Sequence, residues 1–287
     1  MTIHPAGSRD IVVGLDPDRN WHLALAWAAD EAQRRRLPLR LVLAVPPQHD
    51  THHIDDAPGQ TTLRQAGSDK LEQACNWVRD RHPEVAVTGD LLGGFPAPVL
   101  GRAAREARMI VLGSRYLSRT AEFFSAGSLV VPVTAQARCP VVVVGDAEHI
   151  SQQPPYIVAG IDGSASATAA LTFAFDEADL RGAALRVLCV WQRPLIMLDD
   201  EEVALRAQRT LLSEATAGLS EKYPDVHVTH EVLTGHPVEE LARAAEHALA
   251  VVVGRRGRGG YTGMRIGSVV HGLLHRAHCP VITVPTD

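Results

Sequence analysis

Short apolar runs alternate with longer amphipathic segments along the whole chain. In the second half, short apolar runs rich in Val, Ile and Leu are typical of strands covered on both faces, and we place strands near 157–162, 185–191, 226–233, 249–254 and 280–284. The segments between them have the 3.6-residue period of helices, near 166–180, 200–222, 237–248 and 268–277. This alternation predicts an α/β fold with parallel strands.

The first half repeats this pattern, with strands expected near 11–16, 39–45, 84–92, 109–113 and 140–144 and helices between them. Four stretches match in the same order: IVVGLD with IVAGID, LRLVLAV with LRVLCV, MIVLGSR with AVVVGRR, and ARCPVVVV with AHCPVITV. The polar, proline-containing stretch AEHISQQPPY separates the two copies. We therefore expect two tandem domains, residues 1–149 and 154–287.

Right-handed crossovers and the need to cover both sheet faces favour a doubly wound arrangement, with the first and fourth strands as neighbours. Ligands of such sheets bind beyond the carboxyl ends of the strands, where the winding reverses. In the second copy those ends carry Asp162 and Gly254. The sequence therefore places a candidate ligand site at these two residues.

A glycine-rich stretch follows the fourth strand of the second copy. Gly254, Gly257 and Gly267 let the backbone approach a ligand closely, and Gly267-Ser268 precedes a helix whose N–H groups attract an anion. Four arginines add positive charge: Arg255, Arg256, Arg258 and Arg265. This pattern indicates a phosphate-binding loop, and the alternative is a surface loop made soluble by arginines.

The spacing of glycine, two residues, glycine, nine residues, glycine and serine resembles the ATP-binding motif of the universal stress protein family. The resemblance covers essentially the whole chain, as a tandem pair of universal stress domains of the actinobacterial type. It implies two five-stranded parallel sheets of order 3-2-1-4-5 and bound ATP with Mg²⁺ on its phosphates. The residues expected to bind ATP are Ile161, Asp162, Val190, Gly254, Gly257, Arg258, Gly267, Ser268 and Val269. The resemblance also implies a homodimer and an unidentified protein partner.

The first copy departs from this motif in three ways. Tyr116 replaces the second glycine, the stretch to Gly127-Ser128 is one residue longer, and LDPD replaces the Asp-Gly-Ser turn. The matching residues that remain are Asp16, Val45, Gly113, Gly127 and Ser128. We therefore expect a weaker nucleotide site in the first copy, or none.

Composition narrows the function further. The 287 residues carry 28 Lys and Arg against 33 Asp and Glu, a net charge of −5, so we expect neither nucleic acid nor a membrane surface as a partner. Neither lysine, Lys70 or Lys222, follows a glycine as in a P-loop. With four scattered cysteines and no apolar signal or membrane-spanning run, we expect a cytoplasmic protein.

Two histidine clusters are candidate metal sites with plainer alternatives. His271, His275 and His278 have the spacing of one helix face, and DTHHIDD at 50–56 follows the second strand, beside His49. A half-buried helix face and a solvated loop are the commoner explanations for such clusters, so we predict no metal ligand; the sequence also shows no catalytic residue.

Three functions are compatible with the sequence. They are an ATP-binding regulatory module, a slow ATPase or nucleotidyl-transfer enzyme, and a structural dimerisation protein with a vestigial site. The first is the leading interpretation because the sequence offers no general base aimed at the phosphates.

Overall fold

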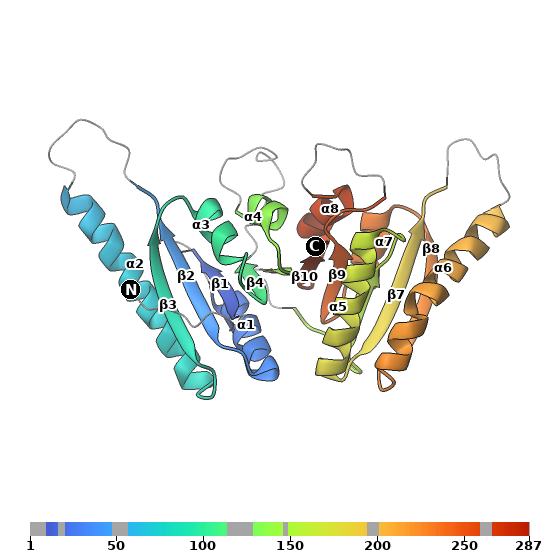
Figure 1. Cartoon of the computed structure of the whole chain (residues 1–287), viewed down its shortest axis with the longest axis horizontal. Coiled ribbons are helices and arrows are strands. Elements are labelled where there is room, and N and C mark those ends of the chain that lie inside the picture. Colours follow the sequence, from blue (N-terminus) through green and yellow to red (C-terminus); the bar gives the residue numbers. More distant parts are fainter. Residues whose placement is uncertain are drawn as a thin grey trace. The chain divides into compact units, whose positions relative to one another are not determined.

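The structure, a computed structural model, describes residues 10–16, 21–47, 57–113, 129–145, 149–193, 201–258 and 266–286. The chain forms two compact units, one ending at residue 145 of the described chain and the other beginning at residue 149 (Figure 1).

The first unit has a parallel sheet of order β3-β2-β1-β4-β5. Its strands are β1 (Ile11–Leu15), β2 (Leu39–Val45), β3 (Val87–Gly93), β4 (Met109–Gly113) and β5 (Val141–Val144). Its helices are α1 (His22–Arg35), α2 (Ala57–Arg81), α3 (Pro96–Ala103) and α4 (Val130–Gln136). The neighbouring β1 and β4 form the predicted point where the winding reverses.

The second unit repeats this order as β8-β7-β6-β9-β10. Its strands are β6 (Tyr156–Gly160), β7 (Ala184–Trp191), β8 (Val228–Thr234), β9 (Ala250–Gly254) and β10 (Val281–Val284). Its helices are α5 (Ala165–Arg181), α6 (Glu201–Lys222), α7 (Pro237–Ala244) and α8 (Ser268–Arg276). The predicted fold, two doubly wound domains of order 3-2-1-4-5, is confirmed.

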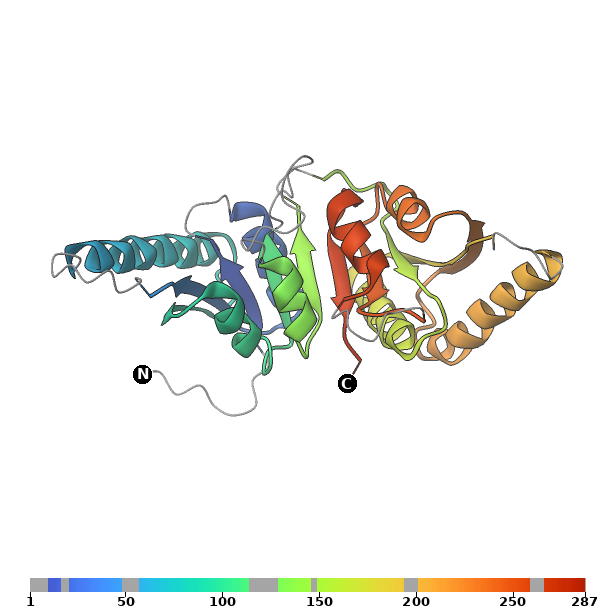
Figure 2. The same ribbon diagram turned by 90° about the horizontal axis from the view of Figure 1, so that it is seen from above.

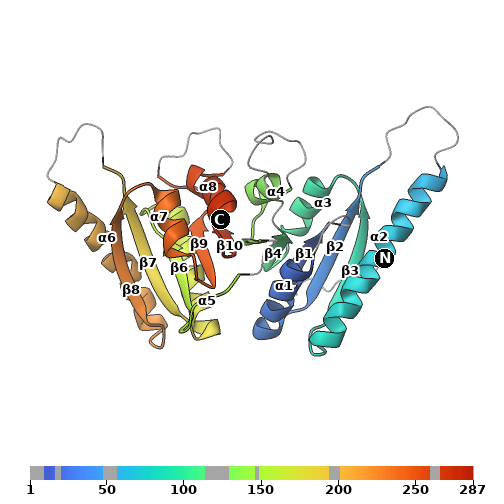
Figure 3. The same ribbon diagram turned by 180° about the vertical axis from the view of Figure 1, so that it is seen from behind.

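Helices cover both faces of each sheet, as Figures 2 and 3 show for each unit taken alone. In the second unit α5 and α6 pack together on one face, and α7 and α8 pack together on the other. The central strands are buried almost throughout, which explains their unbroken apolar runs. Among the described residues, no helix is both long and apolar enough to cross a membrane.

Two strands begin later than the sequence pattern predicts. Val85 and Val226 are buried, at 6% and 8% exposure, yet they precede β3 and β8. Their N–H groups bond back to the carbonyls of His82 and Tyr223, so each valine closes a turn after a helix. Because each of these buried valines is apolar, the sequence pattern extended the predicted strand into the turn that precedes it.

The strand register also corrects one match between the two copies. Ile11 pairs with Leu39 in the first unit, and Ile157 pairs with Leu185 in the second. Equivalent residues in the first two strands of the two units therefore differ by 146 in number. Val45 therefore corresponds to Trp191, and each carbonyl accepts the N–H of a following glycine, Gly94 or Gly235. Ala44 is the residue that corresponds to Val190.

Candidate functional site

The turn between β6 and α5 forms one side of the candidate site. The N–H of Ile161 donates to the carbonyl of Leu188 at 2.8 Å, which extends the β6–β7 pairing to the residue before Asp162. Gly163 has a φ of 75°, a conformation that favours glycine. Ser164 then caps α5, because its Oγ accepts the N–H of Ala167 at 3.1 Å.

The carboxylate of Asp162 joins this turn to the loop after β9. Its Oδ1 accepts the N–H of Ser164 at 3.0 Å, and its Oδ2 accepts the N–H of Arg258 at 2.9 Å. A carboxylate offers about four acceptor positions, so these two bonds leave capacity for a ligand's hydroxyl groups. Asp162 is thus held in place by the backbone and still able to bind.

The first two glycines of the motif lie against this turn. A Cβ atom built on Gly254 would be 2.6 Å from the backbone carbon of Ser166, and one built on Gly257 would be 2.5 Å from Oδ2 of Asp162. Both distances are too short for a Cβ atom unless something moves: the backbone at Ser166 in the first case and the Asp162 carboxylate in the second. The protein's own packing therefore favours glycine at both positions, and most strongly at Gly254.

The third glycine has a different environment. A Cβ atom on Gly267 would be 3.4 Å from its nearest neighbour, the carbonyl oxygen of Arg255, which is an ordinary contact. The Gly267 N–H donates to that same carbonyl at 2.9 Å, so the two ends of the loop are fastened together. As N-cap of α8, Gly267 offers the first helical turn no side-chain hydrogen bond. The amide groups of that turn suit an anion.

Arginines make this loop electropositive. Burial lowers the pKa of Arg255, and repulsion by Arg256 lowers it further. Two cations held this close favour an anion beside them. Arg256 also contacts the turn before α5: its carbonyl accepts the Ser164 hydroxyl and its N–H reaches Ser166 Oγ, both at 3.4 Å. Arg265 lies outside the described residues.

The remaining predicted residues of the second unit surround this centre. Val190 lies near the end of β7 and pairs with Leu233 of β8. Ser268 is exposed at the start of α8, while Val269 packs against the buried core beneath that helix. These positions agree with the edge predicted from the strand ends, and their roles toward a ligand stay predictions.

Sequence reasoning missed Ser166, which lies at the centre of this edge. Its buried hydroxyl donates to the carbonyl of Val284 at 3.4 Å and accepts the N–H of Arg256. It thereby links α5 to both β10 and the glycine loop. A serine in the first turn of a helix carries no distinctive signal, because serine is common near helix starts.

The first unit matches this arrangement only in part. Asp16 directly follows β1 and Gly113 ends β4, as predicted. Tyr116, Gly127 and Ser128 lie outside the described residues. Helix α1 begins at His22 after Trp21, which makes no side-chain cap. When the two units are aligned by their offset of 146 residues, α5 begins three residues earlier than α1, and unlike α1 it has a serine N-cap. The two units thus differ at the turn that holds Asp162.

All four cysteines are free and buried. Burial and, to a smaller extent, the nearby Asp162 carboxylate raise the pKa of Cys189 to about 11, and Arg258 opposes this rise. Burial also raises the pKa of both Cys139 and Cys279 to about 12. These thiols stay protonated at neutral pH, so they behave as small apolar groups, as the sequence indicates.

The three histidines near the C-terminal end do not share a helix face. Helix α8 ends at Arg276, and Ala277 is extended, with ψ at 137°, so His278 leaves the helix. His271 and His275 do stay together, with ring centroids 4.7 Å apart. No group of three or more metal-ligating side chains occurs within the described ranges. The cluster at 49–56 lies outside them.

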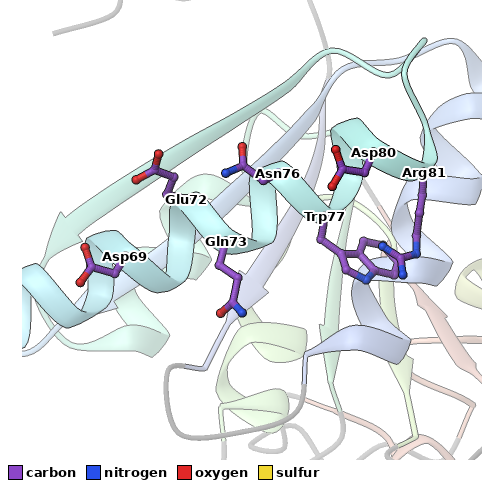
Figure 4. A pocket seen from close by; sticks show the side chains of 7 residues that line it. All are labelled: Asp69, Glu72, Gln73, Asn76, Trp77, Asp80 and Arg81. Atoms are coloured by element: carbon purple, nitrogen blue, oxygen red, sulfur yellow. The ribbon is translucent and has the colours of Figure 1, made fainter.

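A hollow of about 570 Å³ lies elsewhere, on the outer face of α2 in the first unit (Figure 4). Its lining residues follow helical spacing along one helix: Asp69, Glu72, Gln73, Asn76, Trp77, Asp80 and Arg81. The Arg81 guanidinium stacks on Trp77, 4.4 Å from the ring centroid. None of the predicted nucleotide residues lines it, so this hollow is separate from the candidate site.

The fold and the site together define a class: a tandem, doubly wound α/β protein with a glycine-rich, arginine-rich loop where the second sheet reverses its winding. The chain belongs to the universal stress protein family, whose model matches residues 7–145 and 156–285. This confirms the tandem arrangement of two universal stress domains.

Relatives of similar length support this assignment. The chain is 33% identical over 291 residues to universal stress protein Rv2623 of Mycobacterium tuberculosis, covering 96% of each chain. It is also 33% identical over 293 residues to universal stress protein Mb2028c of Mycobacterium bovis, covering 97% of each. A solved universal stress protein from Archaeoglobus fulgidus has the same fold, with a TM-score of 0.73 at 18% identity over 98% of this chain and 97% of that one.

Proposed function

We propose that this protein binds ATP in its second unit and acts as a nucleotide-dependent regulatory module in the stress response. The observation that carries the proposal is the carboxylate of Asp162, held by two backbone N–H groups beside the glycine loop. It stands at the reversal of the sheet's winding, where ligands of this fold class bind.

Each end of ATP has a matching group in this proposal. Asp162 accepts hydrogen bonds from the ribose hydroxyls, with Ile161 and the backbone of Val190 on the nucleoside. The backbone from Gly254 to Gly257 and the first turn of α8, including Ser268 and Val269, bind the phosphates. Arg258 supplies positive charge to the phosphate tail.

The donor set fits a nucleotide polyphosphate. Backbone N–H groups, arginines and a helix N-terminus complement phosphate oxygens, and the absence of a side chain at Gly267 permits close approach to the backbone. Mg²⁺ enters this proposal as part of the nucleotide complex, where it neutralises phosphate charge. The chain's part is to orient the nucleotide and respond to its presence.

A regulatory role is favoured over catalysis. The described loop carries arginines rather than a carboxylate or histidine aimed at the phosphates, so it offers no general base among the described residues. A homodimer, a protein partner that reads the nucleotide state, and a cytoplasmic location complete the proposal and rest on the family resemblance.

Nucleotide analysis of gently purified protein tests the proposal. Retained ATP that stays intact over hours supports a binding module, whereas ADP accumulating with time supports the slow enzyme. A ligand bound only by the native state adds RT ln(1 + [L]/Kd), about 2.7 kcal/mol at a hundredfold excess over Kd, so ATP should raise the melting temperature of stripped protein. An unchanged melting temperature at millimolar ATP favours a vestigial site and contradicts the proposal.

A further inference from the structure

Arg258 contacts the turn before α5 through both its backbone and its side chain. Its N–H donates to Oδ2 of Asp162 at 2.9 Å. A Cβ atom built on Gly163 would lie 2.6 Å from Arg258 Nη2 and 2.8 Å from its Cζ, so the guanidinium lies directly over Gly163. The side chain therefore extends from the end of β9 across to the end of β6.

Helix α6 closes the other side of this arrangement. The same Cβ position on Gly163 lies 2.6 Å from Cδ1 of Leu211, so Leu211 and the Arg258 guanidinium flank one glycine. Cys189, near the end of β7, donates from its Sγ to Gln208 of α6 at 3.1 Å. These contacts bring α6 against the turn after β6 and against the end of β7.

We infer that Arg258 sets the ligand specificity of this site, by covering its nucleoside end when no nucleotide is bound and moving to the phosphates when one is. The inference rests on the proposed ATP function and adds to it. According to this inference, the Arg258 side chain causes the site to prefer nucleoside polyphosphates over nucleosides.

Energetics make this exchange feasible. Arg258 is exposed, so its guanidinium stays largely hydrated above Gly163, and the side chain leaves that glycine at the cost of weak contacts only. Phosphate oxygens then give the guanidinium charge-assisted hydrogen bonds, which are stronger than neutral ones. ATP therefore compensates for displacing Arg258. Adenosine must displace the same side chain and offers it nothing in return.

The inference predicts opposite effects of one substitution on two ligands. Calorimetric titration of nucleotide-stripped protein compares wild type, Arg258→Ala and Arg258→Gln with ATP and with adenosine. We expect Arg258→Ala to weaken ATP binding roughly tenfold, the effect of losing a charged hydrogen bond, and to strengthen adenosine binding several-fold. Arg258→Gln should change both affinities in the same directions by smaller factors.

Arg256→Ala is the matched control, because it removes an equal charge from an exposed neighbour in the same loop. It should weaken ATP binding through the loss of positive charge and leave adenosine binding unchanged. The melting temperature of each of the three variants is measured without ligand. A value close to that of wild type establishes that the variant is folded.

The outcomes separate the two proposals. If wild type binds ATP but Arg258→Ala binds adenosine no better than wild type does, Arg258 is only a phosphate ligand and the inference is wrong. If neither wild type nor the control binds ATP, the proposed function fails and the inference fails with it.

Discussion

Position 257 lies so close to Asp162 that a Cβ atom there would be 2.5 Å from the carboxylate oxygen Oδ2. The next residue, Arg258, donates its N–H to the same oxygen. The second glycine of the motif therefore brings the loop against the protein's own aspartate, before any ligand is considered. Part of the glycine spacing serves to build the site.

Gly267→Ala should separate binding from folding. The new Cβ makes only ordinary contacts in the structure, so the melting temperature without ligand should stay near that of wild type. The same methyl group would stand where phosphates approach the first turn of α8, so ATP affinity should fall by about tenfold or more. Thermal melting and calorimetry on stripped protein measure the two effects.

Gly254→Ala is the comparison for that experiment. Its Cβ would press on backbone atoms of Ser166, and overpacking of this kind costs about 1 to 3 kcal/mol of stability. We expect a lower melting temperature before any ligand is added. Equal stability of the two variants would show that the loop adjusts more freely than these contacts allow.

The fold could be predicted because the signals that determine it are local and repeated. Unbroken apolar runs mark strands such as β4 and β9, and the repeat shows that both units share one topology. The site could be predicted only as a set of residues. That Gly257 lies against Asp162, or that Ser166 links α5 to the loop, depends on contacts between side chains and backbone about 90 residues apart in the chain. No local pattern records such contacts.

The one-residue mismatch between the second strands of the two copies had a similar origin. LRLVLAV and LRVLCV look equivalent by composition, yet the strand pairings make Trp191, and not Val190, the counterpart of Val45 in the second unit. The register of a parallel strand is defined by its pairing with neighbouring strands. In a run of apolar residues of similar size, the sequence alone does not reveal a shift of one position.

The carboxylate of Asp162 should contribute to stability as well as to binding. In Asp162→Ala, the N–H groups of Ser164 and Arg258 both lose their acceptor, and each must find water or stay unsatisfied. Because water can replace the carboxylate at the exposed Arg258 N–H, we expect a loss of about 0.5 to 1.5 kcal/mol in unfolding free energy, measured by urea denaturation, together with weaker ATP binding. An Asp162→Ala protein as stable as wild type would mean that the loop is held by other contacts.

Stability should depend on pH through His275. Burial lowers the pKa of His275 below its usual 6.5, and the neighbouring His271 lowers it further. As the pH falls through 6.5, the unfolded chain binds a proton that native His275 resists, so stability decreases. His275→Gln should therefore reduce the drop in melting temperature between about pH 7.5 and 5.5. His278→Gln, a change outside α8, serves as the control and should leave the drop unchanged.

Nucleotide binding should be asymmetric, with one tight ATP site per chain in the second unit. Tyr116 stands in the first copy where Gly257 stands in the second. In the second unit, a tyrosine at 257 would force its Cβ into Asp162 and break the Arg258 N–H bond. Gly257→Tyr should thus abolish tight ATP binding by importing the first copy's sequence feature. Asp16→Ala, the matched change in the first unit, should leave tight binding intact. Calorimetry that finds two equal tight sites, or tight binding that survives Gly257→Tyr, would overturn this asymmetry.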